Sequence, residues 1–447
     1  MSIQELIELI NNEAPLNEIE TLVETGIDIN EPVGDMGLCA LHHAVYKNRP
    51  ECVLYLVNHG CNINVQDQCG FTPLHVASRY NRVDVMRELL QLGANLETED
   101  AVGCPALNLA LQKGYEECAE SLLEKGANPN KHYKHVGYEI HQLPPDTPKC
   151  LELLLQHGAD PELRNPKGLT ALHVAIKGGN ILYVYILLQH GANSNATCAT
   201  MTSHNRWSAL HLSVIRGERG ITELLLLYGA DPNIKDVFGN SALHHVAAHG
   251  QVTIAQLLVN HGAIVALNNE RKYQPLHRAC ASSIDPDMIT LLLENGADAR
   301  AQTILLETPM QLLLSHITNI PASASPDCQK QVLCLINYGA RVTIKSDNND
   351  TDNIISILLP LSIHHLAVIR LLLGVAEEIF IPPEETDLLQ GLDEYVRDYI
   401  LMLSRNVRSL KHLARKVVRQ CLETPCNSRN VNALEIPKSL KNYLLYS

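Results

Sequence analysis

The chain has 447 residues, enough for two to four ordinary domains or for one long array of repeats. Hydrophobic residues make up 46% of the chain and charged residues 19%, so it can bury a large core, which excludes a disordered protein. The formal charge of −14 argues against nucleic acid as the main partner, and no uninterrupted apolar run of about 20 residues predicts a membrane-spanning helix.

The composition also indicates a cellular compartment. Residues 1–13 lack the basic and apolar regions of a secretory signal. The 13 cysteines, an odd number at irregular spacing, are typical of reduced thiols rather than of a disulfide framework. We therefore expect a cytoplasmic protein, with the nucleus as a second location.

Two short sequence tags recur along the chain in one phase, at a period of about 33 residues. The first is a Gly-Ala-Asp/Asn-like tag whose glycines are Gly26, Gly60, Gly93, Gly126, Gly158, Gly191, Gly229, Gly262, Gly296 and Gly339. The second is similar to Thr-Pro-Leu-His-x-Ala and occupies residues 39–44, 72–77, 170–175, 208–213, 241–246 and 274–279. Together the tags resemble the ankyrin repeat, which implies an all-α solenoid of helix-turn-helix-loop units.

The residues of one unit favour this fold on physical grounds. Thr72 can cap the start of a helix, and Pro73 follows at the first helical position, where its missing N–H costs nothing. Residues 83–92 carry apolar side chains at helical spacing, and Gly93 then suits the left-handed conformation that ends a helix. Because no unit can bury its apolar face alone, the units are expected to stack.

The repeats divide the chain into three parts. Residues 1–345 are predicted to form an array of about ten units, in which residues 1–30 form an amino-terminal cap. Residues 132–165 are a degenerate unit whose prolines should shorten its first helix. Residues 346–403 hold a further degenerate repeat and a connecting helix, and residues 404–447 form a separate tail.

Two insertions interrupt the regular spacing of the array. Residues 195–206 precede Trp207, the only tryptophan, and should enlarge one loop tip. Residues 317–328 are placed between the two helices of a late unit and should project away from the surface of loop tips.

The tail differs from the array in charge and in pattern. Residues 404–447 carry nine Lys or Arg against two Glu, whereas the rest of the chain is strongly acidic. The segment 409–423 predicts an amphipathic helix, because its apolar residues share one face and Lys411, Arg415 and Arg419 lie elsewhere.

The tail resembles a SOCS box, and the order of the two modules is that of the ankyrin-repeat and SOCS-box family. Ser409, Leu410, Ala414 and Val418 match Ser-Leu-x-x-x-Cys-x-x-x-hydrophobic, with Ala414 where the family has Cys; Glu435 replaces the first proline of the cullin box. The resemblance implies elongin-binding residues Leu410, Leu413, Ala414, Val417 and Val418. It implies cullin-binding residues Leu434, Pro437, Leu440 and Tyr443.

This resemblance predicts a function without catalysis. The chain is expected to be the substrate receptor of a ubiquitin ligase that contains elongin B/C, a cullin, with cullin 5 favoured, and a RING protein. No signature of a hydrolase, a phosphate-binding loop or a dinucleotide site is found, so we expect neither enzymatic activity nor a cofactor. The alternative is a plain ankyrin scaffold whose carboxyl-terminal helices only cap the array.

The histidines allow a metal site to be considered. The repeat histidines His42, His75, His173, His211, His244 and His277 occur once per unit, too far apart to share an ion, and the ankyrin resemblance implies that they bridge backbone groups. The segment 132–150 gathers His132, His135, His141 and Cys150, but its spacing matches no zinc pattern. We therefore expect no metal, with a metalloenzyme as a minor alternative.

One column of residues, at the loop tip before each first helix, is rich in rings. Its members are Leu38, Phe71, Cys104, Tyr138, Leu169, Trp207, Asn240, Tyr273 and Glu307. Two interpretations stay open: staples that pack on their own helices, or a row of rings on which a target protein docks. Candidate target-binding residues are Phe71, Tyr138, Met201, Arg206, Trp207 and Tyr273.

Two asparagines also match a modification pattern of ankyrin repeats. Asn30 and Asn233 resemble residues that an asparaginyl hydroxylase modifies, although their ordinary role is hydrogen bonding within the turn.

Overall fold

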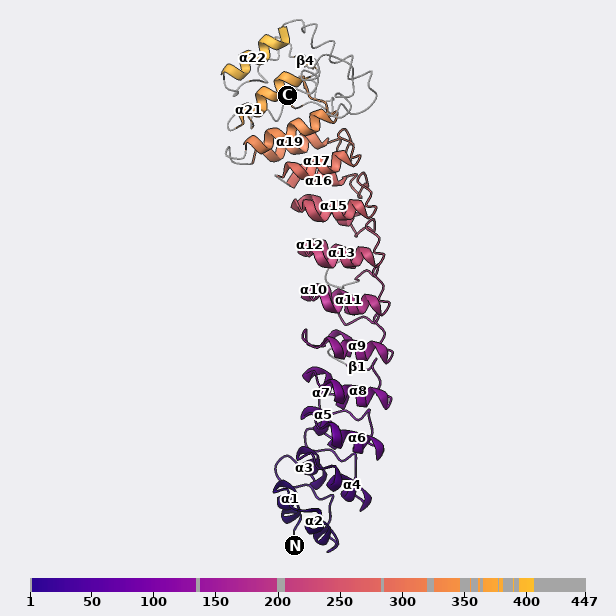
Figure 1. Cartoon of the computed structure of the whole chain (residues 1–447). Helices are drawn as coiled ribbons and strands as arrows, with labels where there is room; N and C mark the ends of the chain where they lie inside the picture. Colours follow the sequence, from indigo (N-terminus) through magenta and orange to yellow (C-terminus); the bar gives the residue numbers. More distant parts are fainter. Residues whose placement is uncertain are drawn as a thin grey trace. The chain divides into compact units, whose positions relative to one another are not determined.

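The computed structural model shows two compact units, formed by residues 1–204 and 205–447. The described residues are 2–133, 137–198, 206–282, 285–319, 325–345, 354, 361, 365–376, 378–380, 389 and 394–405. The all-α solenoid fold is confirmed, because the described residues of each unit form mainly stacked helix pairs with long loops (Figure 1).

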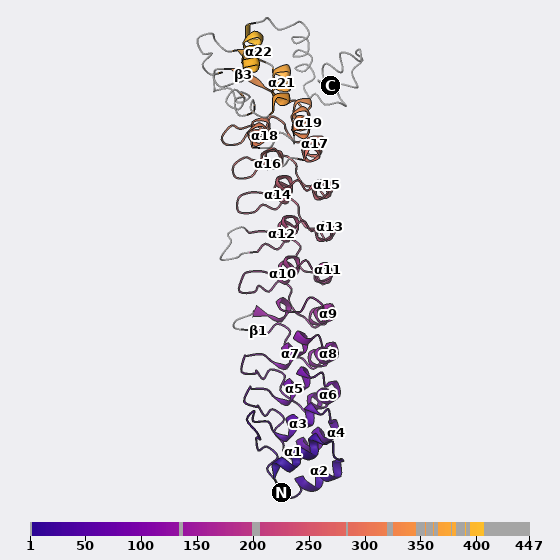
Figure 2. The same cartoon turned by 90° about the vertical axis from the view of Figure 1, so that its left-hand side faces the viewer.

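The first unit contains the helix pairs of the amino-terminal half. Its helices are α1 (Ile3–Asn11), α2 (Leu16–Val23), α3 (Ala40–Tyr46), α4 (Pro50–Asn58), α5 (Pro73–Arg79), α6 (Val83–Gln91), α7 (Ala106–Lys113), α8 (Glu116–Glu124), α9 (Pro148–Gln156), α10 (Ala171–Gly178) and α11 (Ile181–Gln189). First helices pack in the order α1, α3, α5, α7, and second helices pack in the order α2, α4, α6, α8, α9, α11. Figure 2 shows these two rows, with the loops on the side away from the second helices.

The pair α5 and α6 shows why the sequence folds in this way. The Thr72 hydroxyl accepts a hydrogen bond from the His75 backbone N–H, and Pro73 occupies the first turn of α5. In α6, Val85, Met86 and Leu89 are fully buried against the neighbouring helices. Gly93 has a φ of 84°, the left-handed conformation that only glycine adopts without strain.

The unit predicted to be degenerate departs most from the pattern. Its first helix is replaced by a two-stranded hairpin, β1 (His132–Tyr133) with β2 (Gly137–Tyr138), and by one 3₁₀ turn, η1 (Glu139–His141). Two prolines follow at 144–145, where they cannot donate the hydrogen bonds that a longer helix needs. The second helix, α9, is complete.

The second unit repeats the arrangement. Its helix pairs are α12 (Ala209–Arg216), α13 (Arg219–Leu227), α14 (Ala242–His249), α15 (Val252–Asn260), α16 (Pro275–Ser282), α17 (Pro286–Glu294), α18 (Pro309–Ile317) and α19 (Ser325–Asn337). One expectation is wrong at both ends: residues 317–328 were expected to lie between two helices, but Ile317 is the last residue of α18 and residues 325–328 form the first turn of α19. Cys328 is buried there, and Pro326 is tolerated because it lies in the first turn.

A smaller group of elements follows the last helix pair. The helix α21 (Leu366–Val375) packs on α19, and the strand β3 (Thr343–Lys345) pairs in parallel with β4 (Glu378–Phe380). The helix α22 (Glu394–Arg405) lies in the region where a connecting helix was predicted and contacts β4. No helix among the described residues is both long enough and apolar enough to cross a bilayer.

Candidate protein-binding site

The repeat histidines join each loop to the next, as the ankyrin resemblance implied. His42 Nδ1 accepts a hydrogen bond from the Cys39 backbone N–H at 3.1 Å, and Nε2 donates to the Phe71 carbonyl oxygen at 2.9 Å. The same two contacts are made by His75, His211, His244 and His277. His173 accepts from the Thr170 N–H.

Burial keeps these imidazoles neutral. It lowers the pKa of His42 and His75 below the ordinary value, and it lowers the pKa of His211 and His244 to about 4. Both ring nitrogens already have backbone partners in the five bridging histidines, so these residues serve the stack rather than a metal ion.

The segment 132–150 likewise offers poor ligands. His141 Nε2 donates to the Leu163 carbonyl oxygen at 3.0 Å, and Cys150 is fully buried in α9, where burial raises the pKa of its thiol to about 11. His132 packs edge-on against Tyr138, and His135 lies outside the described residues. Within the described part of the chain, no three metal-ligating side chains come together.

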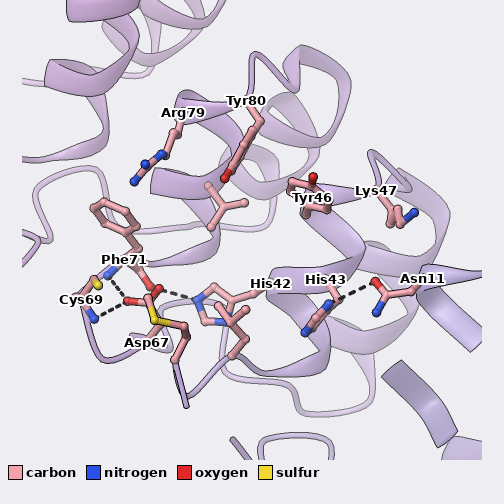
Figure 3. Close-up of a pocket in the computed structure, with 13 residues that line it drawn as sticks. Asn11, His42, His43, Tyr46, Lys47, Asp67, Cys69, Phe71, Arg79 and Tyr80 are labelled. Atoms are coloured by element: carbon pink, nitrogen blue, oxygen red, sulfur yellow. Dashed lines mark hydrogen bonds between the residues drawn. The ribbon is translucent and has the colours of Figure 1, made fainter. Parts of the chain in front are cut away.

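A groove in the first unit, between the first helices and loops of consecutive repeats, offers a surface on which a partner could dock (Figure 3). Its volume is about 610 Å³. We call it the α3–α5 groove. It is lined by Asn11, Met36, Leu38, His42, His43, Tyr46, Lys47, Asp67, Cys69, Phe71, Val76, Arg79 and Tyr80.

The centre of the α3–α5 groove is apolar. Val76 of α5 is buried there, while Met36, Tyr46 and Tyr80 are each exposed by 44–48%. The rings of Tyr46 and Tyr80 meet edge to face, with centroids 4.9 Å apart. Exposed aromatic side chains on a rigid helical support are typical of protein-binding surfaces.

The charges of the groove are mainly basic. Arg79 places its guanidinium 5.4 Å from the centre of the Phe71 ring, and no carboxylate among the described residues pairs with it. Lys47 lies 3.9 Å from Glu13 in a loose, partly exposed ion pair. Asp67 is engaged in its own loop, where Oδ1 accepts the backbone N–H groups of Cys69 and Phe71.

The four predicted ring residues belong to different elements of the fold. Phe71 lines the α3–α5 groove, whereas Tyr138 belongs to the hairpin, and Trp207 and Tyr273 belong to the second unit. All four are half-buried against imidazoles: Phe71 on His75 at 5.7 Å, Tyr138 on His141 at 6.0 Å, Trp207 on His245 at 6.5 Å and Tyr273 on His277 at 5.7 Å. The contacts of Phe71, Tyr138 and Tyr273 are with their own helical turns and support the staple interpretation, whereas His245 lies in α14 of the repeat after Trp207. The exposed part of each ring leaves target binding as a proposal.

The other predicted residues fall into two groups. Arg206 is exposed and has a φ of 43°, while Met201 lies outside the described residues. The predicted adaptor-binding residues also lie outside the described residues: Leu410, Leu413, Ala414, Val417, Val418, Leu434, Pro437, Leu440 and Tyr443.

The side chains of Asn30 and Asn233 join consecutive repeats and do not bond within their own turn, although bonding within the turn was expected. Asn30 Nδ2 donates to the Gly60 carbonyl at 3.1 Å, and its Oδ1 accepts from the Asn62 N–H at 2.7 Å. Asn233 makes the equivalent pair with Gly262 and Ile264.

The sequence interpretation missed Tyr46, Lys47, Arg79 and Tyr80. Their signal was present, because the segments Tyr-Lys-Asn-Arg at 46–49 and Arg-Tyr-Asn-Arg at 79–82 occupy the same phase of consecutive repeats. Taken alone, each segment is typical of the polar end of a helix, and the two segments come together only when the repeats stack.

Comparisons with known families agree with this architecture. A family model described as ankyrin repeats (3 copies) matches residues 9–67, 41–133, 145–236 and 218–303, more than half of the chain. A second family model, described as SOCS box, matches residues 406–445. The chain belongs to the ankyrin-repeat and SOCS-box family.

Several relatives of this ankyrin-repeat and SOCS-box protein are known. Ankyrin repeat and SOCS box protein 16 of Homo sapiens is 26% identical over 314 residues, covering 66% of this chain and 64% of that protein. The B-cell lymphoma 3 protein homolog of Mus musculus is 36% identical over 134 residues, covering 29% of each chain. The chain therefore spans less than two thirds of the length of these curated relatives. The solved ankyrin repeat domain of Bcl-3 is 28% identical and covers 58% of this chain and 99% of its own, with a TM-score of 0.35.

Proposed function

We propose that this protein is the substrate receptor of an elongin–cullin–RING ubiquitin ligase. The observation that carries the proposal is the match of residues 406–445 to the SOCS box, on the carboxyl-terminal side of an ankyrin array. The array binds a target protein and the tail recruits the ligase. The chain performs no bond chemistry itself.

The tail divides between two partners in this proposal. In the proposed arrangement, residues 1–345 are the array, residues 346–403 connect it to the tail, and residues 404–447 are the SOCS box. The residues expected to bind elongin C, in a complex with elongin B, are Leu410, Leu413, Ala414, Val417 and Val418. The residues expected to bind the cullin, with cullin 5 favoured, are Leu434, Pro437, Leu440 and Tyr443.

The mechanism is proximity. A target held on the array has its lysines close to the ubiquitin-conjugating enzyme that the RING protein brings, so an encounter between separate molecules becomes an intramolecular one. Candidate contacts on the array are Phe71 and the α3–α5 groove, together with Tyr138, Met201, Arg206, Trp207 and Tyr273.

The test is capture of elongin B/C by the full chain and by two matched variants. Leu410→Asp should weaken capture at least about 100-fold, because burying an unpaired carboxylate in an apolar interface costs several kcal/mol. Lys411→Asp, which changes the polar face of the same predicted helix, should change capture much less. Equal capture by wild type and Leu410→Asp would contradict the assignment.

Deletion of residues 404–447 separates the proposal from the scaffold alternative. If the SOCS box is a separate module, its deletion should abolish elongin capture and leave the denaturation midpoint of the array unchanged. A lowered midpoint with no elongin capture by the intact chain would instead support a scaffold whose tail only caps the repeats.

A further inference from the structure

We propose that the α3–α5 groove binds an acidic segment of the target protein, in which one large apolar side chain lies between two carboxylates. This inference rests on the proposed function and specifies the chemistry of the target. Its argument combines the shape of the groove, its charges and the place of its residues in the repeat.

The apolar side chain is indicated by the centre of the groove. Tyr46 and Tyr80 form an edge-to-face wall, and Val76 lies buried beneath the opening. Met36 is 48% exposed on the facing loop and can adapt to the shape of an inserted side chain. A partner that covers these exposed surfaces gains the hydrophobic free energy that the free protein does not realise.

The carboxylates are indicated by the charge of the groove. The chain as a whole has a formal charge of −14, yet the groove contains two cations, Lys47 and Arg79, against Asp67 alone. Burial lowers the pKa of His42 and His43, so these imidazoles add no charge near neutral pH. The groove is therefore a basic site on an acidic protein, which favours an acidic partner.

The two cations are placed to act separately. In Figure 3, Arg79 and Lys47 lie at opposite ends of the groove, with Tyr80 and Tyr46 between them. The Phe71 ring supports the Arg79 guanidinium from one side, and its N–H donors suit a bidentate carboxylate. Lys47 has only the loose contact with Glu13, which a better-placed carboxylate can replace.

The combination is local to two repeats. Tyr46 and Lys47 occupy the same repeat positions as Arg79 and Tyr80, and the next repeat has Gln112 and Lys113 there. The groove therefore differs in chemistry from the neighbouring stretch of the array, as a specificity element should.

Selection from a random phage-displayed peptide library by the immobilised full chain tests the proposal. Peptides recovered by wild type should be enriched in Asp and Glu on both sides of a large apolar residue. Arg79→Glu should bind the synthesised consensus peptide at least about tenfold more weakly, because a charge-assisted bidentate contact becomes a repulsion. Lys47→Glu should show the same direction with a smaller factor, and Tyr80→Ala should remove the apolar preference.

Arg87→Glu is the matched control, because Arg87 is exposed on α6 of the same repeat and outside the groove. It should bind the consensus peptide as wild type does. Recovery of peptides without acidic excess, or equal binding by wild type and Arg79→Glu, would overturn the proposal. So would sedimentation that shows a dimer dissociated by Arg79→Glu, because the occupant would then be a second copy of the chain.

Elongin capture by each groove variant keeps the two proposals apart. Loss of peptide selection with elongin capture intact refutes the groove alone. Peptide selection by a chain that captures no elongin refutes the ligase role and leaves the groove as the docking site of a scaffold.

Discussion

The regular repeat of α5 and α6 and the atypical repeat of η1 and α9 solve the same packing problem differently. Both keep a full second helix, and both bury its apolar face: Leu89 in α6 and Leu154 in α9 are fully buried. The regular repeat adds a capped first helix of seven residues, whereas the atypical one has only three residues of 3₁₀ helix.

The difference shows which part of a repeat is replaceable. Where the first helix is missing, polar side-chain contacts still join the neighbouring repeats. Asn108 stands where most repeats have histidine, and its Nδ2 donates to Oε2 of the buried Glu139 at 3.0 Å. His141 then donates onward to the Leu163 carbonyl. The side-chain hydrogen bonds between repeats are retained although the first helix is not. The second helix and this hydrogen bond are therefore the features that hold consecutive repeats together.

Acidification should produce the largest effect, through the buried histidines that bridge the regular repeats. The folded pKa of His211 and His244 is about 4, below the ordinary 6.5, so the unfolded chain binds protons first as the pH falls. The contribution of each histidine to the free energy of unfolding is fully present above pH 6.5 and is lost as the pH falls towards 4, by up to about 3 kcal/mol for each histidine. The urea denaturation midpoint of the wild type should fall as the pH is lowered across this range, and the midpoint of His211→Asn should fall less steeply. An equal slope in that variant would show that the imidazole does not set the loss.

Truncation of the second helices should come next. Leu89→Ala and Leu154→Ala should each destabilise the protein by about 3 kcal/mol, because both leave a cavity in a fully buried contact. Urea denaturation followed by circular dichroism, with hydrogen exchange to localise the change, measures both. A much smaller loss for Leu154→Ala would break the comparison, because the atypical repeat would then not depend on its second helix.

Loss of the hydrogen bond between Asn108 and Glu139 should give the smallest effect. Asn108→Ala leaves the buried Glu139 carboxylate without its Asn108 donor and should cost about 2 kcal/mol. Lys113→Ala, an exposed change on the same helix, is the control and should cost less than about 0.5 kcal/mol. Equal denaturation midpoints for the two variants would show that the Asn108 contact contributes little to joining the repeats.

Much of the fold follows from local rules that the sequence displays. The Thr72 cap, the first-turn Pro73 and the left-handed Gly93 each act within a few residues, so their roles are readable from the chain. The prolines at 144–145 predicted a shortened first helix, which in the structure is reduced to η1, but the Asn108–Glu139 contact was not predicted. That contact joins residues 31 positions apart, and its geometry depends on how two repeats stack.

The candidate site was less predictable for the same reason. Phe71 was identified because it belongs to a column of rings, yet its neighbours Tyr46 and Arg79 come from two different first helices. Neither is unusual in its own segment. The start of α19 was misplaced because the inserted segment was read as one connection, although Ser325 and Pro326 are residues that begin helices.

The imidazole bridges have a consequence for the order in which the chain is assembled. His42, His75, His211 and His244 each donate to a carbonyl 29 residues further along the chain. During synthesis a histidine therefore finds its acceptor only after the following loop has left the ribosome. Folding can proceed from the amino terminus, with only the most recently synthesised repeat lacking its hydrogen bonds to the next one. Little apolar surface that could aggregate is then exposed at any moment.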